Sequence, residues 1–220
     1  MKKLDKTEVL IWAFAAAPLV LTAASLPFLP QLFPMHWGLD GQPDGWGGAG
    51  QLLLMTGTGF GSALLLKFLP FIDPKRKNYD RFAGGYRALR LCFSVFYCFM
   101  TGIMLAGALC PELAAYLSVD RLVTVGVGLL LCVMGNFMPK FKQNYFCGVK
   151  TPWALADEEN WRRTHRFAGP IWFWGGLLIA VCALVLRGGA LAAVLGAGIC
   201  AMVLGPTLYS YLLFKKSANH

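Results

Sequence analysis

Charged side chains are scarce in this sequence. Only 14% of its 220 residues are Asp, Glu, Lys or Arg, whereas a typical soluble domain carries about 25%. Hydrophobic residues make up 57% of the chain. This balance argues against an ordinary water-soluble domain and indicates a chain whose main solvent is lipid.

The cysteines lack a pattern of pairing. Seven are present, an odd number, and none forms a Cys-x-x-Cys pair. Six of them lie in apolar runs, where thiols usually pack as small hydrophobic groups. We therefore expect neither a disulfide framework nor a zinc site. Cys147 alone lies in polar sequence, and a structural role is favoured there over a reactive thiol.

Six apolar stretches are long enough to cross a membrane, which takes about 20 residues. The predicted spans are 8–29, 50–71, 88–110, 120–138, 170–187 and 190–213. Gly57, Gly59 and Gly61 in the second span, and the Gly-Val-Gly of the fourth, predict close packing between helices. The predicted fold is an all-α polytopic membrane protein with six transmembrane helices.

The centres of these spans lack Asp, Glu, Lys, Arg and His. Ion-coupled transporters and pumps usually carry such groups at mid-membrane. The spans also show no Asp pair, no H-E-x-x-H and no clear Ser–His dyad for intramembrane proteolysis. We expect a protein that is not an enzyme and that holds no cofactor.

Basic residues fall on one side of the predicted membrane. With the N-terminus in the cytoplasm, 18 of the 20 Lys and Arg lie at cytoplasmic ends, and only Arg121 and Arg187 lie outside. Such a bias orients membrane proteins, so both termini are predicted to be cytoplasmic. Topology then explains the net charge of +9 better than direct nucleic-acid binding does. Lys67, Arg87 and Arg90 lie near the predicted cytoplasmic ends, where they can snorkel.

The first long connector, 30–49, is predicted to lie outside and contains no Lys or Arg. Its ionisable groups are His36, Asp40 and Asp44. Imidazole and carboxylate groups at this density suit a divalent cation or a cationic peptide. The Asp-Gly dipeptides also suit an ordered turn, and we favour a structural or recognition loop over a metal site.

The second long connector, 139–169, is predicted to face the cytoplasm. Asp157 can cap a helix that begins at the next residue. Along that helix Trp161, His165 and Ala168 share one face, and three arginines occupy the others. We predict an amphipathic helix that lies at the inner membrane surface, with its arginines on anionic headgroups.

Within this connector the sequence GNFMPKFKQNYFCGVKTPWALADEENWRRTHRFAG closely resembles the signature of the SdpI family of bacterial membrane proteins. The outer loop, PMHWGLDGQPDGW, resembles the domain of unknown function that commonly precedes that signature. Lys150 stands where the family commonly has Arg, and Ala154 and Ala156 stand where hydroxyl groups are common. The resemblance divides the chain into a two-span region, 1–87, and a four-span SdpI-like region, 88–220.

The resemblance implies a protein of the bacterial cell membrane that protects against a secreted peptide toxin. It also implies inward signalling, in which a small winged-helix repressor is held at the membrane. The expected partners are membrane lipids, the toxin outside and the repressor inside. The expected toxin-binding residues are His36, Trp37, Asp40 and Asp44. The expected partner-binding residues of the inner loop are Asn144, Gly148, Lys150, Thr151, Pro152, Trp153, Trp161, Arg163, Thr164, His165 and Arg166.

Two other classes of protein stay open on the sequence alone. One is a membrane enzyme or metal-binding factor that uses His36, Asp40 and Asp44. The other is a transporter of a small solute or lipid. Bound metal would favour the former, and a continuous polar cavity would favour the latter.

Overall fold

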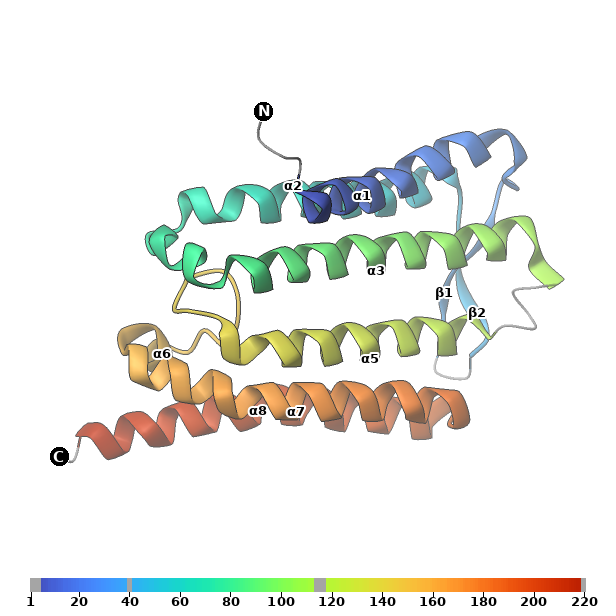
Figure 1. Ribbon diagram of the computed structural model, residues 1–220. Coiled ribbons are helices and arrows are strands. Elements are labelled where there is room, and N and C mark those ends of the chain that lie inside the picture. The colour runs from blue at the N-terminus through green and yellow to red at the C-terminus, as the bar shows by residue number, and fades with distance from the viewer. Residues whose placement is uncertain (1–4, 39–40, 113–117, 219–220) are drawn as a thin grey trace.

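Six long helices lie side by side, and a small hairpin closes one end of the bundle (Figure 1). The structure is a computed structural model that describes residues 5–38, 41–112 and 118–218. The long helices are α1 (Lys6–Ser25), α2 (Ala49–Ile72), α3 (Ala83–Leu109), α5 (Val119–Phe137), α7 (Glu158–Val185) and α8 (Gly188–Ala218). All six are long and apolar enough to cross a membrane. The predicted six-span helical fold is confirmed.

The two ends of the bundle carry different connectors. At the hairpin end, β1 (Phe33–Trp37) and β2 (Pro43–Gly47) form an antiparallel pair between α1 and α2. At the other end, which we call the loop end, an irregular segment follows α5 and leads into α7. The remaining short helices are η1 (Leu26–Phe28), η2 (Arg76–Phe82), η3 (Met138–Lys140) and α6 (Pro152–Ala156).

The hairpin adds a small β element to a fold expected to be all-α. The prolines of the loop exclude a long helix but are tolerated in a two-stranded ribbon, where each strand is an edge. Pro34 pairs with Trp46, and register shifts follow toward His36 and Trp37. The buried Phe33 of β1 packs among residues of α2 and α3 and anchors the hairpin on the bundle.

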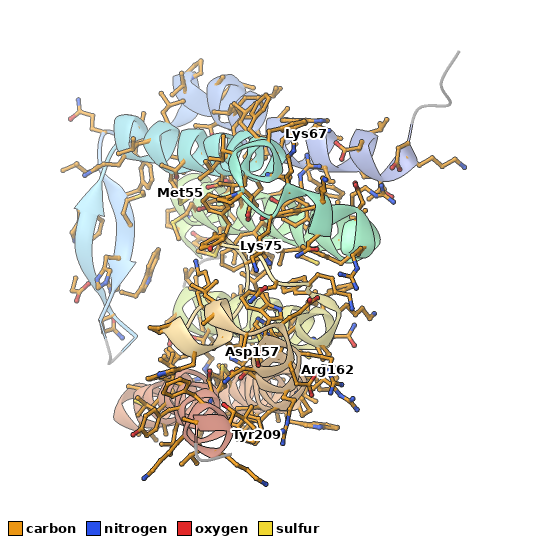
Figure 2. All side chains as sticks on the ribbon, turned by 90° about the vertical axis from the view of Figure 1, so that its left-hand side faces the viewer. Met55, Lys67, Lys75, Asp157, Arg162 and Tyr209 are labelled. Atoms are coloured by element: carbon orange, nitrogen blue, oxygen red, sulfur yellow. The ribbon has the colours of Figure 1, made fainter. Side chains whose placement is uncertain are left out.

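The helices form two groups when the bundle is viewed from its loop end (Figure 2). Helices α1, α2 and α3 pack on one another. In the second group, α5 packs on α7, and α7 packs on α8. Helix α3 also packs on α5 and joins the groups. The two groups therefore meet along the α3–α5 pair, with the hairpin at one end and the loop that follows α5 at the other.

Glycine pairs let α5 and α7 approach at backbone contact distance. A Cβ atom added at Gly128 would lie 2.7 Å from the carbonyl oxygen of Gly176, and one added at Gly135 would lie 2.8 Å from that of Gly169. Larger residues do not fit at such distances, and small residues commonly mark close helix contacts in membranes. The glycines therefore fix how α7 sits against α5.

Helix α7 corrects the prediction for the inner connector. The helix runs unbroken from Glu158 through Pro170 to Val185, so its first turns continue the fifth span. The predicted helix along the membrane surface is wrong. The face that carries Trp161 and His165 is buried against protein, because the loop that follows α5 folds over it.

Arg90 corrects a second prediction. Its side chain is 3% exposed and its Nη1 atom lies 2.5 Å from Oε1 of Glu8 in α1. Lys67 of α2 lies 3.3 Å from the other oxygen of the same carboxylate. Arg90 thus does not snorkel. A buried charge requires a partner, and the packing of α1 against α3 supplies one.

Candidate functional site

Asn144 organises the irregular segment at the loop end. Its Oδ1 atom accepts hydrogen bonds from the backbone N–H groups of Phe146 (2.9 Å) and Cys147 (2.7 Å). Its Nδ2 atom donates to the carbonyl oxygens of Lys142 (2.9 Å) and Cys147 (3.1 Å). The fully buried amide is thereby satisfied at both ends. An aspartate would accept but could not donate.

Asp73 ties this segment to the connector between α2 and α3. One carboxylate oxygen, Oδ2, accepts from the hydroxyl of Tyr79 and from the backbone N–H of Tyr145, each at 2.9 Å. The other accepts from the N–H of Lys75 at 2.7 Å. The sequence analysis did not single out Asp73 or Tyr79. The available signal was an Asp-Pro that directly follows an apolar helix.

Gln143 continues the same connection toward α6. Its Nε2 atom donates to the carbonyl oxygens of Ala154 and Leu155, each at 2.9 Å. Asn78 of the α2–α3 connector donates to the backbone oxygen of Gln143 at 2.7 Å. The three segments at the loop end are therefore joined by side-chain-to-backbone bonds, which fix the loop without a regular element of its own.

Gly148, His165 and Trp161 form a packed contact between the loop and α7. The Nε2 atom of His165 accepts from the N–H of Val149 at 3.0 Å, and Nδ1 lies 2.8 Å from the carbonyl oxygen of Trp161. One nitrogen must accept and the other must donate, so the buried ring is neutral with its proton on Nδ1. The ring stacks on that of Trp161, with the ring centroids 4.0 Å apart. The indole N–H of Trp161 donates to the carbonyl oxygen of Phe141 at 2.9 Å.

A chain of hydroxyl and amide groups joins α6, α7 and α8. The hydroxyl of Thr151 lies 2.6 Å from that of Ser210. Ser210 donates to the Asn160 side-chain oxygen at 2.8 Å, and Thr164 donates to the same oxygen at 3.0 Å. All four side chains are buried. The sequence analysis missed Asn160 and Ser210, although Ser210 is a polar residue within an apolar helix.

Several predicted partner-binding residues are therefore part of the protein interior. The structure brings the predicted set together at one end of the bundle but divides it by exposure. The buried members are Asn144, Thr151, Trp161, Thr164 and His165, and the exposed basic members are Lys150, Arg163 and Arg166.

Two more members of the predicted set lie at the start of α6. Pro152 occupies the first turn of that helix, where its missing N–H costs nothing. The half-buried Trp153 packs 5.1 Å from the ring of Tyr211 on α8. These contacts hold α6 against the last span.

Cys147 has the structural character expected for it. Its thiol is buried, and burial raises its pKa to about 11, with the carboxylate of Asp73 acting in the same direction and Lys150 opposing it. A thiol with so high a pKa is a poor nucleophile at neutral pH.

The predicted residues of the outer loop lie at the opposite end. Nδ1 of His36 and Oδ1 of Asp44 are 2.5 Å apart across the two strands, and their side chains are 73% and 53% exposed. Trp37 is half-buried beside them. Asp40 lies outside the described residues. Among the residues that the structure describes, no three His, Cys, Asp or Glu side chains form a metal-binding group.

The fold and these two ends define a multi-pass membrane protein. Its loop end combines a buried hydrogen-bonded framework with an exposed basic face.

Residues 140–210 match the SdpI/YfhL protein family, and residues 13–60 match a domain of unknown function, DUF1648. The chain is 32% identical over 114 residues to the protein named Immunity protein SdpI of Bacillus subtilis (strain 168). That alignment covers 52% of this chain and 55% of the relative, or about half the relative's length. No solved structure matches the chain. The resemblance expected from the sequence is confirmed over residues 140–210, which are similar to the SdpI/YfhL family.

Proposed function

We propose that this protein is an immunity protein, which protects the membrane of its own cell from a secreted peptide toxin. One observation carries the proposal. The SdpI/YfhL match begins at Lys140 and ends at Ser210, so it contains the part of the loop-end framework that follows α5, from Asn144 to Ser210. The similarity to a relative named as an immunity protein supports the same conclusion.

The hairpin is the proposed site for the toxin. It exposes the paired His36 and Asp44 side chains together with Trp46, which is 59% exposed. The loop that forms it has no Lys or Arg. A surface of this kind suits a cationic peptide with an apolar face, because β2 carries both an exposed carboxylate and an exposed indole.

The exposed basic face of the loop end is the proposed site for an inward signal. Arg163 and Arg166 project from α7 opposite its buried face, and Lys150 is exposed on the preceding loop. A cytoplasmic repressor with an acidic docking surface would meet three cations there. The buried framework beneath them holds these side chains on rigid backbone, which favours specific recognition.

Immunity is tested by deletion of the gene. The deletion strain should stop growing in spent medium from its parent and should recover when the protein is expressed from a plasmid. A deletion strain that grows like its parent in medium shown to kill an unrelated sensitive strain would rule out the proposal.

The two proposed sites are tested in the complemented strain. His36→Ala with Asp44→Ala should reduce survival, whereas Arg163→Glu with Arg166→Glu should abolish recruitment of the repressor and leave survival unchanged. Lys215→Glu with Lys216→Glu is the matched control, because it makes the same charge change at the exposed end of α8. Equal recruitment in all three strains would show that the basic face serves topology alone.

A further inference from the structure

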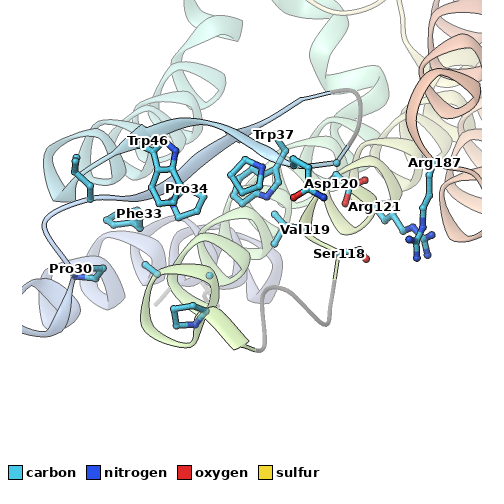
Figure 3. Close-up of a pocket in the computed structure, with 17 residues that line it drawn as sticks. Pro30, Phe33, Pro34, Trp37, Trp46, Ser118, Val119, Asp120, Arg121 and Arg187 are labelled. Atoms are coloured by element: carbon cyan, nitrogen blue, oxygen red, sulfur yellow. The ribbon is translucent and has the colours of Figure 1, made fainter.

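The two arginines that break the basic pattern of the chain line the same cavity. Arg121 lies in the first turns of α5, and Arg187 lies between α7 and α8. Both border a cavity of about 640 Å³ at the hairpin end, together with Asp120, Trp37 and Trp46 (Figure 3). Basic residues at the hairpin end run against the usual charge bias of membrane proteins. The presence of both in one cavity suggests that they bind a ligand.

The guanidinium group of Arg121 has a donor available to such a ligand. The Nε atom of Arg121 is buried and has no hydrogen-bond partner within the described part of the chain. Its Nη1 atom lies at a long 3.5 Å from the carbonyl oxygen of Leu184. A buried donor left without a partner costs free energy, and an anionic oxygen in the cavity would supply the missing acceptor.

An apolar groove continues from this cavity along α3 and α5. The groove has a volume of about 290 Å³ and shares Gly107 and Val119 with the cavity. Its other walls include Phe99, Gly102 and Leu122. A Cβ atom added at Gly102 would meet nothing within 4 Å. The cavity at the end of the spans, which places both arginines among largely apolar walls, therefore adjoins an apolar groove between α3 and α5.

We propose that this cavity and groove form a binding site for one phospholipid, phosphatidylethanolamine in particular. Arginine recognises phosphate oxygens through paired N–H donors, and Arg121 and Arg187 would hold the phosphodiester. Asp120 supplies an acceptor for the ammonium group of the headgroup. The groove between α3 and α5 takes an acyl chain, and Trp46 lies at the level of the headgroups, as interfacial tryptophans do. The site shares Trp46 with the proposed toxin surface, but the argument for it does not rest on the proposed immunity function.

Native mass spectrometry of the purified protein tests the site. In a mild detergent with added phosphatidylethanolamine, the wild type should retain one lipid. Arg121→Gln with Arg187→Gln should lower the occupancy about tenfold or more, and Lys215→Gln with Lys216→Gln should not. Equal loss in both double variants would place the lipid elsewhere and overturn the proposal.

The groove is tested separately, because loss of the arginines could disturb folding. Gly102→Leu fills open space in the groove and should also lower lipid occupancy, whereas Gly61→Leu, which fills open space on α2, should not. Full lipid retention in a folded Gly102→Leu variant would contradict the proposal.

Two competitors identify the ligand. Added phosphatidylethanolamine should displace the bound lipid more readily than added phosphatidylcholine does. The quaternary ammonium of phosphatidylcholine cannot donate a hydrogen bond to Asp120. Chain-free glycerophosphoethanolamine should not displace it at equal concentration. Displacement by the chain-free compound would show a site for soluble phosphates instead of a lipid site.

Discussion

At the scale of single residues, the loop end depends on side chains that satisfy backbone groups. Asn144 meets four backbone partners, and His165 bridges two. Each bond removes the cost of a buried polar group. Gly148 has a φ of +102°, and a Cβ atom there would lie 2.2 Å from Nε2 of His165. The loop and α7 are therefore fitted to each other at this point.

This fit predicts a coupled effect of two substitutions. Gly148→Ala should destabilise the protein by about 1–3 kcal/mol, the usual cost of overpacking, and residual backbone strain adds to it. In the background of His165→Ala the same change should cost less, because the clashing ring is gone. Thermal unfolding of the two single variants and the double variant measures the coupling.

Gly189→Ala is the control, since a Cβ atom there meets nothing within 4 Å. Strict additivity of the Gly148 and His165 changes would show that they do not contact each other in the folded protein.

The raised pKa of Cys147 predicts slow alkylation. Its thiol pKa is raised from 9.0 to about 11, so at pH 8 the reactive thiolate is about a hundredfold rarer than for an ordinary cysteine. In single-cysteine variants, maleimide should label Cys147 far more slowly than the exposed Cys110. The difference should narrow as pH rises toward 11.

The same shift has a consequence for stability. The folded state holds the thiol proton more tightly than the unfolded state, so this contribution to stability is complete below pH 9 and is lost as pH rises from 9 to about 11. In the alkylation test, rapid labelling of Cys147 at pH 8 in folded protein would contradict the predicted protection, because it would mean that the loop opens readily.

At the scale of elements, glycine spacing decides which helices meet closely. The close packing predicted for Gly59 and for the Gly-Val-Gly of the fourth span is confirmed by short Cβ distances to neighbours. The same prediction is wrong for Gly57 and Gly61, where an added Cβ meets nothing within 4 Å. Sequence shows that a glycine permits an approach, but the neighbouring helix decides whether one occurs.

The α5–α7 contact predicts a severe effect of a small change. A Cβ atom added at Gly135 would lie 2.3 Å from the backbone nitrogen of Phe173, and a helix backbone cannot move aside as a side chain can. Gly135→Ala should therefore cost about 1–3 kcal/mol and lower the amount of folded protein. Fluorescence-detected size-exclusion chromatography after graded heating measures the loss.

Gly57→Ala provides the comparison for this prediction. It places the same methyl group in open space on α2 and should be neutral or slightly stabilising, because alanine favours helix over glycine. Similar melting curves for the two variants would contradict the close contact.

At the scale of the whole molecule, hydropathy predicts where the spans lie but not which distant residues contact one another. An apolar stretch of sufficient length marks a span regardless of its neighbours. The bonds that build the loop end, however, join residues far apart in sequence. Asp73 meets Tyr145 across 72 positions, and Asn160 meets Ser210 across 50. No local pattern encodes such pairings, so the sequence analysis found the loop residues but assigned their buried members to partner binding.

The arrangement of the two helix groups gives both ends a structural link. The hairpin rests on the α2–α3 side through Phe33 and reaches Asp120 of α5, because a Cβ atom at Gly41 would lie 3.1 Å from that carboxylate. At the other end, Asp73 joins the α2–α3 connector to the loop after α5. Each end therefore spans both groups, and a ligand that moves one group against the other would affect both ends.

Sidedness decides which end of the bundle faces the outside of the cell and which faces the cytoplasm. The described Lys and Arg residues gather at the loop end, with the exceptions of Arg121 and Arg187, and this bias predicts a cytoplasmic loop end. In a cysteine-free background, Gln31→Cys should react with a membrane-impermeant maleimide in intact cells. Glu158→Cys, which leaves the capping Asp157 in place, should react only after the cells are opened. Both positions are exposed, so slow labelling cannot be ascribed to burial. Labelling of Glu158→Cys alone in intact cells would reverse the orientation, put the basic face outside and exclude a cytoplasmic repressor as its partner.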